Sequence, residues 1–476
     1  MKIPPTTVPD FAERIAAIND VVHGLVWGPF MLAFFLFVGL MFTVRSKAFQ
    51  IRHIKLWLRM TFLSIFKNKS VRKSDNKRAI SQFQSACTAL AATLGTGNIV
   101  GVATAIALGG PGSIFWMWVS AFFGMMTSYA ENTLGIKYRF KGKNGEWVGG
   151  AMYYMERGLN SKWLAAAFSL FCMLAAFGMG NMAQANGIAA GLKASFGVSP
   201  VVTAIVITAF TAPVILGGIK RIAGVTEKLV PFIAIFYILG GIIVIAAHAD
   251  KIAEAFVLII GEALKPQSAA GGFAGYGIAA ALRRGVSRGV FTNEAGLGSS
   301  VMAHSATDID EPVVQGMWGI FEVFLDTIVI CTVTALAILT SGAYSMAEHL
   351  RFFTDNPGGE LPNAMTGVGL TSAAFDTALP FGGEFVTIAI TLFAYSTILG
   401  WSYFGERAAS YLFGHKAVIP YKIAFIAFIA VGCLSGLNLV WDISDTFNGL
   451  MAIPNLISIT LLSGQVIKMT NDYTRR

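Results

Sequence analysis

The sequence has few charged residues for its length. Asp, Glu, Lys and Arg make up 13% of the 476 residues, whereas 55% are apolar and the mean hydropathy is +0.64. An ordinary soluble domain carries roughly 25% charged residues. This shortage excludes the soluble class, and the 51 glycines agree with membrane helices, in which glycine is more frequent than in soluble ones. We therefore expect an all-α integral membrane protein.

Cysteine and histidine are scarce as well. The four cysteines stand in separate apolar segments with neither metal-ligand spacing nor a disulfide framework. The six histidines lie apart from one another, and no two have the spacing of zinc ligands. A membrane-embedded enzyme would need a constellation of such residues, so we expect no enzyme and no cofactor.

Eleven apolar segments predict eleven transmembrane helices, because most are near or above the roughly 20 residues that span a bilayer. They lie at about 20–44, 82–108, 113–135, 163–190, 200–217, 227–247, 267–282, 313–341, 382–404, 418–438 and 445–467. The N-terminus lacks the basic region of a signal peptide, so we expect 20–44 to be a retained first helix.

The Lys and Arg residues are distributed unevenly between the predicted loops. With the N-terminus outside, 29 of the 35 fall in inner segments and 6 in outer ones. This follows the positive-inside rule and predicts a cytoplasmic C-terminus. The net charge of +9 then reflects topology, with the stretch 45–78 near anionic lipid, and we expect no nucleic-acid partner.

Without the first helix, ten segments remain and divide into two sets of five. We expect 1–81 to hold the extra helix and a basic cytoplasmic loop, 82–249 the first five-helix repeat, and 250–476 the second repeat and the tail. Because five is odd, the two sets enter the membrane from opposite sides, as an inverted repeat requires. Transporters with such repeats place their substrate site at interrupted helices near the midplane.

Two glycine-rich interruptions occupy corresponding positions in the two sets. The first is Thr93–Asn98, with the sequence TLGTGN, and the second is Gly271–Gly277, with four glycines in seven residues. Close packing of small residues would explain either run alone. Their matched positions favour a pair of broken helices. After the second break we expect an inner loop from Arg283 to Ser299, and the outer loop 341–380 could be a lid.

The run Gly109–Gly124, GGPGSIFWMWVSAFFG, resembles the signature of the alanine/glycine:cation symporters, also called sodium:alanine symporters. The runs 95–103, 291–299 and 321–331 fit the same family, and the resemblance extends from about residue 20 to 467. Ala151 departs from the family pattern, which has proline before Met-Tyr-Tyr, and Ser300-Val301 stands in place of Ala-Pro.

The resemblance implies a LeuT-type five-plus-five fold with one extra N-terminal helix, located in the cell inner membrane. It implies symport of small neutral amino acids, alanine and glycine first, driven by sodium. A proton-coupled carrier of the same or another small amino acid is the alternative.

The first break suits the substrate carboxylate, because a broken helix exposes backbone N–H groups at a helix N-terminus. The candidate residues there are Thr93, Gly95, Thr96, Gly97 and Asn98. The ammonium group needs oxygen acceptors, for which we expect carbonyl groups around Phe273 and Gly275.

Three further side chains are candidates for the substrate site. Gln184 would contact the substrate or form an interhelical hydrogen bond. Thr397 and Trp401 are one turn apart and share a helix face. Trp401 would close the side-chain pocket or serve as an interfacial aromatic residue.

Resemblance to the LeuT-type site assigns a sodium cage to the first and eighth core helices. It consists of the carbonyl groups of Ala91, Leu94 and Phe393 with the hydroxyl groups of Ser396 and Thr397. The two hydroxyls could instead bond to their own helix. The cage contains no titratable group, which favours sodium over a proton.

Three carboxylates, Glu131, Glu322 and Asp326, fall inside apolar segments. Intramembrane carboxylates are functional candidates by default. For Glu322 and Asp326 the alternatives are pairing with inner-loop arginines such as Arg283 or Arg288, or a role in proton coupling.

Overall fold

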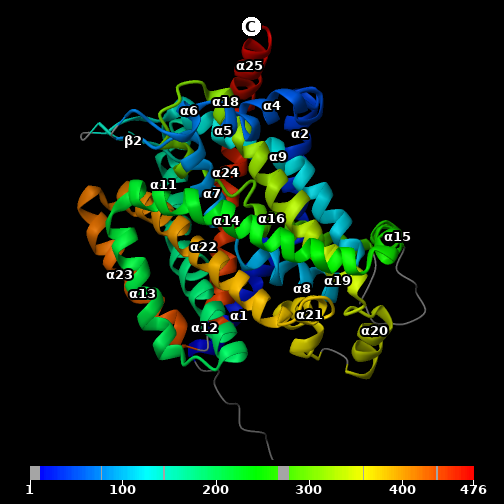
Figure 1. The fold of residues 1–476 in the computed structure, drawn as a ribbon. Helices are drawn as coiled ribbons and strands as arrows, with labels where there is room; N and C mark the ends of the chain where they lie inside the picture. Colours follow the sequence, from blue (N-terminus) through cyan, green and yellow to red (C-terminus); the bar gives the residue numbers. More distant parts are fainter. Residues whose placement is uncertain (1–10, 77, 143–144, 266–277, 357–358, 436–437) are drawn as a thin grey trace, which may run out of the picture.

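The computed structural model describes residues 11–76, 78–142, 145–265, 278–356, 359–435 and 438–476. The described chain forms a bundle of helices with one antiparallel hairpin, in which Phe140 pairs with Val148. The hairpin and the C-terminal helix lie at the same end of the molecule, which we call the basic end (Figure 1).

The first half of the chain supplies the following elements: α1 (Phe11–Val26), α2 (Pro29–Arg45), α3 (Phe49–Arg52), α4 (Ile54–Met60), α5 (Phe62–Lys67), α6 (Lys69–Arg72), α7 (Gln82–Thr93), η1 (Thr96–Asn98), α8 (Val100–Gly109), α9 (Gly112–Tyr138), β1 (Phe140–Lys141), β2 (Trp147–Val148), α10 (Ala151–Leu159), α11 (Lys162–Phe177), η2 (Gly178–Met182), α12 (Ala183–Phe196), α13 (Pro200–Leu216) and α14 (Gly218–Ala247).

The second half supplies these elements: η3 (Ala249–Lys251), α15 (Ile252–Ala263), α16 (Ile278–Asn293), α17 (Val301–Ser305), α18 (Pro312–Val323), η4 (Phe324–Cys331), α19 (Thr332–Ser341), α20 (Met346–Asp355), η5 (Asn363–Met365), α21 (Gly367–Asp376), α22 (Gly382–Phe413), η6 (His415–Ala417), α23 (Val418–Leu434), α24 (Asn438–Leu461) and α25 (Ser463–Thr474).

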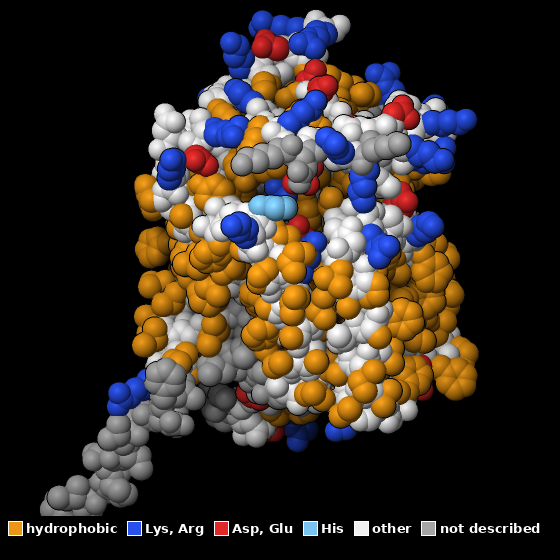
Figure 2. Space-filling model, turned by 90° about the vertical axis from the view of Figure 1, so that its left-hand side faces the viewer, with side chains coloured by type: hydrophobic (Ala, Val, Ile, Leu, Met, Phe, Trp, Pro, Cys, Tyr) orange, Lys and Arg blue, Asp and Glu red, His pale blue; other side chains and the backbone are white. Residues whose placement is uncertain are grey.

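Six helices of the described chain are long and apolar enough to cross a membrane. The count rises to seven if Asp442–Leu461 and Ser463–Thr474, which meet at 57°, form one span. Figure 2 shows a broad band of hydrophobic side chains on one face, with Lys and Arg gathered toward the basic end. This arrangement is the one a membrane-embedded bundle requires.

Local sequence accounts for the start of the first interrupted helix. The Ser81 hydroxyl accepts a hydrogen bond from the Gln84 N–H at 3.1 Å, and the Gln84 side chain accepts one from the Ser81 N–H at 3.0 Å. This reciprocal capping box satisfies two helix-terminal donors and fixes where α7 begins. Gln84 lines one pocket together with Arg72 of α6, which lies toward the basic end, so α7 begins near that end.

The interrupted helix is enclosed on all sides by other helices. α7 packs against α14 and α22, and α8 packs against α16, α19 and α21. α9 packs against α16 and α18, and α11 and α12 pack against α22. The turn between α7 and α8 is therefore surrounded by helices from both halves of the chain.

The structure corrects the predicted inner loop from Arg283 to Ser299. Residues up to Asn293 belong to α16, and the segment from Val290 to Ser300 is buried in the bundle. The arginines on this helix were counted with the inner segments, yet they lie beside the first turns of α24. Because α24 has 24 residues and rises about 1.5 Å per residue, its first turns are far from the basic end.

Two other segments differ in detail from the prediction. The first apolar segment forms α1 and α2, and its helix begins at Phe11 instead of near residue 20. The outer loop 341–380 contains α20, η5 and α21, and α21 packs against α8, α19 and α22. A helix packed on three others is part of the bundle wall in this conformation.

Candidate functional site

The first interruption lies where the sequence predicts it. α7 ends at Thr93, a single turn of 3-10 helix follows at Thr96–Asn98, and α8 begins at Val100. The Asn98 side chain caps this turn, because its Oδ1 accepts a hydrogen bond from the Gly95 N–H at 3.0 Å. Its Nδ2 donates to Asp326 Oδ1 at 2.6 Å, which ties the turn to η4.

The two glycines of this turn permit close contact with two different neighbours. A Cβ added at Gly95 would lie 2.9 Å from Thr397 Oγ1 on α22. One added at Gly97 would lie 2.8 Å from a methyl carbon of Thr292 on α16. Both contacts are too short for a side chain, so glycine allows the turn to fit between α16 and α22.

A second interruption follows α16. Glu294 has a φ of +55°, which only a small share of non-glycine residues adopt, and Gly296 and Gly298 also have positive φ values. We call residues 294–300 the carboxylate-held turn. The predicted second break at Gly271–Gly277, with the candidates Phe273 and Gly275, lies outside the described residues.

The five predicted sodium ligands lie together between α7 and α22. Ser396 Oγ is 3.3 Å from the Ala91 carbonyl oxygen and 2.8 Å from that of Phe393. Thr397 Oγ1 is 3.4 Å from the Leu94 carbonyl oxygen and 3.0 Å from that of Phe393. All five residues are buried. The hydroxyls therefore bond to their own helix and also reach the carbonyl groups of α7.

Gln184 lies beside the first interruption. Its Nε2 donates to the Met179 carbonyl oxygen at 3.1 Å, within its own helix. Its Oε1 is buried without a hydrogen-bond partner among the described residues, and it would lie 3.8 Å from a Cβ at Gly95. Thr96 is buried nearby, and the Thr93 hydroxyl bonds back to α7. An unpartnered acceptor pointing toward the turn is available for a donor such as an ammonium group.

Asn181 and Asn186 on the same helix have a different role. Asn181 Nδ2 donates to the Phe425 carbonyl oxygen at 2.6 Å, and Asn186 Nδ2 donates to that of Ser435 at 2.9 Å. Both bonds tie η2 and α12 to the α23 region. These two amides are interhelical contacts.

Trp401 is fully buried in the bundle, so it is not an interfacial aromatic residue. Its indole Nε1 donates to Glu294 Oε1 at 3.0 Å, and the other oxygen of Glu294 accepts from the Ser299 hydroxyl. Trp401 thus joins α22 to the carboxylate-held turn. Glu294 was missed because it was placed in a loop, although an acidic residue next to a glycine-rich apolar run is a signal that could have identified it.

Glu131 on α9 also holds this turn. Its Oε1 accepts hydrogen bonds from the N–H groups of Gly296 and Gly298, both at 3.1 Å. The same oxygen accepts from the Asn455 side chain of α24, whose Nδ2 also donates to the Gly296 carbonyl oxygen at 2.9 Å. One buried carboxylate therefore fixes the backbone between α16 and α17.

The expected arginine partners of Glu322 and Asp326 are wrong. Glu322 Oε1 lies 2.7 Å from His304 Nε2 on α17. Asp326 accepts from Asn98 and, at 2.7 Å, from the Thr327 hydroxyl. The arginines of α16 instead line a cavity together with Asp442 and Asp445 of α24.

The loop after α17 is held in place near the basic end. Arg139 donates to the carbonyl oxygens of Ser305 and Thr307, the latter at 2.6 Å, and its guanidinium lies 3.9 Å from the Trp147 ring centre. Burial lowers the pKa of Arg139 to about 10, although Asp310 opposes this shift. The loop after α17 is thereby held against the β-hairpin.

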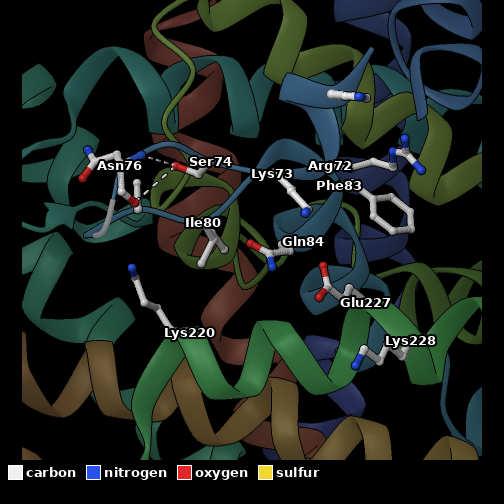
Figure 3. A pocket seen from close by; sticks show the side chains of 12 residues that line it. Arg72, Lys73, Ser74, Asn76, Ile80, Phe83, Gln84, Lys220, Glu227 and Lys228 are labelled. Carbon is white, nitrogen blue, oxygen red and sulfur yellow. Dashed lines mark hydrogen bonds between the residues drawn. The ribbon is translucent and has the colours of Figure 1, made fainter. Parts of the chain in front are cut away.

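A separate pocket of about 870 Å³ opens near the start of α7 (Figure 3). Arg72 and Lys73 lie on one side, and Lys220 and Lys228 of α14 lie on the other. None of the predicted substrate or sodium residues lines it.

An interrupted helix inside a bundle of apolar helices, surrounded by buried polar groups, is typical of a membrane transporter. The sodium:alanine symporter family model matches residues 12–476, so the chain belongs to this family. The family consists of secondary transporters, and the chain is accordingly a multi-pass membrane protein and not an enzyme.

Individual relatives agree with the family. The chain is 46% identical to the sodium/alanine symporter AgcS of Methanococcus maripaludis, over 98% of this chain and 97% of the relative. It is 42% identical to an uncharacterized transporter of Haemophilus influenzae, over 97% of each chain. The crystal structure of MhsT in complex with L-phenylalanine superposes with a TM-score of 0.55 at 14% identity, over 82% of this chain and 90% of that one, which supports the fold alone.

Proposed function

We propose that the protein is a sodium-coupled symporter of alanine and glycine that works by alternating access. The arrangement of five buried oxygens at Ala91, Leu94, Phe393, Ser396 and Thr397 carries this proposal. Sodium prefers such hard, uncharged oxygen ligands, and a bound ion would take the place of the hydrogen bonds that now link α22 to α7. Binding would thereby join the two helices.

The amino acid would bind at the adjacent turn. Its carboxylate would accept from the backbone N–H groups around Gly95, Thr96 and Gly97, where the following helix begins. Gln184 Oε1 is an available acceptor for the ammonium group. Trp401 would limit the space for the substrate side chain, which favours alanine and glycine over larger amino acids.

Asn98 and Asp326 act in this proposal as the support of the turn. Both polar atoms of the Asn98 side chain already have partners, so its amide positions the backbone for the substrate. Thr93 stands at the last turn of α7, where its hydroxyl borders the same space.

The proposed topology has eleven membrane spans, with the N-terminus outside, the C-terminus in the cytoplasm, and the protein in the cell inner membrane. Residues 1–81 would contain the extra helix and basic loop, and 82–249 and 250–476 would form the inverted repeats. The Lys- and Arg-rich basic end supports the orientation. The arginines on α16 lie away from that end. They therefore lower the excess of Lys and Arg on the side proposed to be cytoplasmic, but an excess remains.

The experiment is uptake of labelled alanine into liposomes that contain the purified protein. An imposed inward sodium gradient should drive saturable uptake, and unlabelled glycine should compete. A proton gradient alone should drive none. Uptake driven only by protons would retain the carrier and reject the sodium cage, whereas no uptake under either gradient would reject the substrate assignment.

A further inference from the structure

The pocket of about 870 Å³ near the start of α7, which we call the basic pocket, has no part in the proposed transport site. Its lining contains one acidic side chain, Glu227, and five basic ones. The basic residues are Lys69 and Arg72 of α6, Lys73 directly after it, and Lys220 and Lys228 of α14. Within the described parts of the chain, none of these five forms an ion pair. Their positive charge is therefore available to an anionic ligand.

The basic side chains approach the pocket from two walls. Figure 3 shows the Lys73 ammonium pointing toward α14 from the segment before α7, whereas the Lys220 ammonium points from α14 toward Asn76 of that segment. Lys228 lies about two turns further along α14. A phosphate group between the walls can accept from donors on both, because it presents several oxygens in different directions. The basic pocket therefore suits a ligand that carries a phosphate group.

An exposed apolar face of α14 leads directly to the basic pocket. Phe232, Ile235 and Leu239 are each more than half exposed, and Lys228 precedes them on the same helix face. Only 39% of the most apolar part of this helix is buried inside the structure. In a bilayer, such exposed apolar side chains contact acyl chains. A phospholipid whose acyl chains follow this face brings its headgroup to Lys228.

The other wall of the basic pocket belongs to a segment with apolar and basic side chains side by side. Phe62 and Phe66 of α5 are exposed, and α6 with its two basic residues follows after Asn68. Short helices of this composition lie in the headgroup region of a membrane. We therefore expect both walls to stand at the depth of the lipid phosphate groups.

We propose that the basic pocket is a binding site for the headgroup of an anionic phospholipid, whose acyl chains lie along Phe232, Ile235 and Leu239. The phosphate group joins Lys73, before α7, to Lys228 on α14. The two helices already contact each other deeper in the bundle, where the hydroxyls of Thr88 and Thr226 lie 3.1 Å apart. The bound lipid thus adds a second connection, at the start of the interrupted helix. This inference goes beyond the proposed function, because it uses none of the substrate or sodium residues.

The first test is lipid binding by the delipidated protein in detergent, followed by native mass spectrometry. Phosphatidylglycerol should bind at least about tenfold more tightly than phosphatidylcholine, since the latter has no net charge. Lys73→Gln combined with Lys228→Gln should weaken phosphatidylglycerol binding about 25-fold, because each lysine near an anionic surface contributes a factor of about five. Lys69→Gln combined with Lys220→Gln is a second variant of the same pocket.

The matched control is Lys162→Gln combined with Lys468→Gln. It removes the same charge from two exposed lysines that do not line the basic pocket, so phosphatidylglycerol binding should not change. Equal weakening in the control and in the pocket variants would show an effect of net charge alone and would overturn the proposal. Unchanged binding in both pocket variants would overturn it as well.

A competition experiment distinguishes a lipid headgroup from a free anion. Inorganic phosphate at millimolar concentration should leave bound phosphatidylglycerol in place, because it gains nothing from the apolar face of α14. Displacement by inorganic phosphate would show that the pocket takes a soluble anion and would reject the lipid. Both experiments measure binding without transport, so a failure of sodium-driven alanine uptake would reject the proposed function and leave this test unaffected.

Discussion

The two interruptions are held by different groups. The backbone of the turn at Thr93–Asn98 contacts the Asn98 amide and the hydroxyls of α22, and the Asp326 carboxylate accepts a hydrogen bond from the Asn98 side chain. The carboxylate-held turn, residues 294–300, is fixed by Glu131 and Glu294, which accept from backbone N–H groups and from Trp401. Charge-assisted hydrogen bonds are roughly twice as strong as neutral ones.

Because of this difference, we expect the first turn to exchange its contacts during transport and the second turn to keep one arrangement. Neutral contacts between α7 and α22 can be exchanged for a cation and a substrate at modest cost, because each contributes only about 0.5–1.5 kcal/mol. A buried carboxylate that loses its donors is left unpaired, which is far more costly. We therefore expect substitutions at the first turn to impair transport and substitutions at the second to impair stability.

The largest effect is expected for Asn98→Ala. The substitution removes the cap of the first turn and its link to Asp326, so alanine uptake should fall to background while the protein still inserts into the membrane. Labelled uptake in proteoliposomes measures this, with size-exclusion chromatography as the folding check.

Asn186→Ala is the matched control for that variant. It also removes a buried amide that bonds across helices, but that amide contacts only the α23 region. Its uptake should stay close to that of the unaltered protein. Normal uptake by Asn98→Ala would remove the first turn from the substrate site.

The next effect concerns sodium. Replacing both hydroxyls of the cage, with Ser396→Ala and Thr397→Val, should raise the half-saturating sodium concentration about tenfold or more, because contacts to a charged group contribute about 1.5–3 kcal/mol. The sodium dependence of alanine uptake measures this. Ser402→Ala on the same helix removes a hydroxyl that bonds to Leu399 and should have no effect. An unchanged sodium dependence in the double variant would place the coupling ion elsewhere.

Glu131→Ala tests whether a carboxylate stabilises the turn at residues 294–300. It leaves the N–H groups of Gly296 and Gly298 without their acceptor, at about 1–3 kcal/mol for each. The thermal unfolding midpoint in detergent should fall clearly. Asp355→Ala is the control, because its exposed pair with Arg351 contributes little. A variant as stable as the unaltered protein would show that this turn needs no carboxylate.

The smallest effect is expected for Trp401→Phe. The ring volume is largely kept, but Glu294 loses one donor and retains the Ser299 hydroxyl. We expect a loss of about 1–3 kcal/mol in unfolding free energy, and a smaller shift of the thermal midpoint than for Glu131→Ala. A larger shift would mean that Glu294, and not Glu131, is the principal anchor of the turn.

The first turn could be predicted from the sequence because its signal is local. Two glycines and an asparagine within an apolar run are costly in a membrane helix unless they form a break. The turn at 294–300 could not be predicted in this way, because it is held by Glu131 and Asn455, both distant in the sequence. The glycine-rich run 271–277 lies outside the described residues, so the break predicted there stays a prediction.

The partners of the buried carboxylates could not be predicted from the sequence either. Position within an apolar segment identifies Glu131, Glu322 and Asp326, but it does not show that His304 meets Glu322 or that Asn98 meets Asp326. Likewise, counting Lys and Arg over the predicted loops assigns the arginines of α16 to the inner side. The count treats this segment as a loop, whereas it forms a helix.

The sequence by itself determined the membrane class, the first interrupted helix, the family and the members of the candidate sodium cage, because hydropathy, glycine placement and motifs are properties of short segments. Only the tertiary structure decided the turn at 294–300 and the partners of the buried carboxylates. Each of these consists of side chains that are far apart along the chain, and the packing of α9, α16, α18 and α24 brings them together.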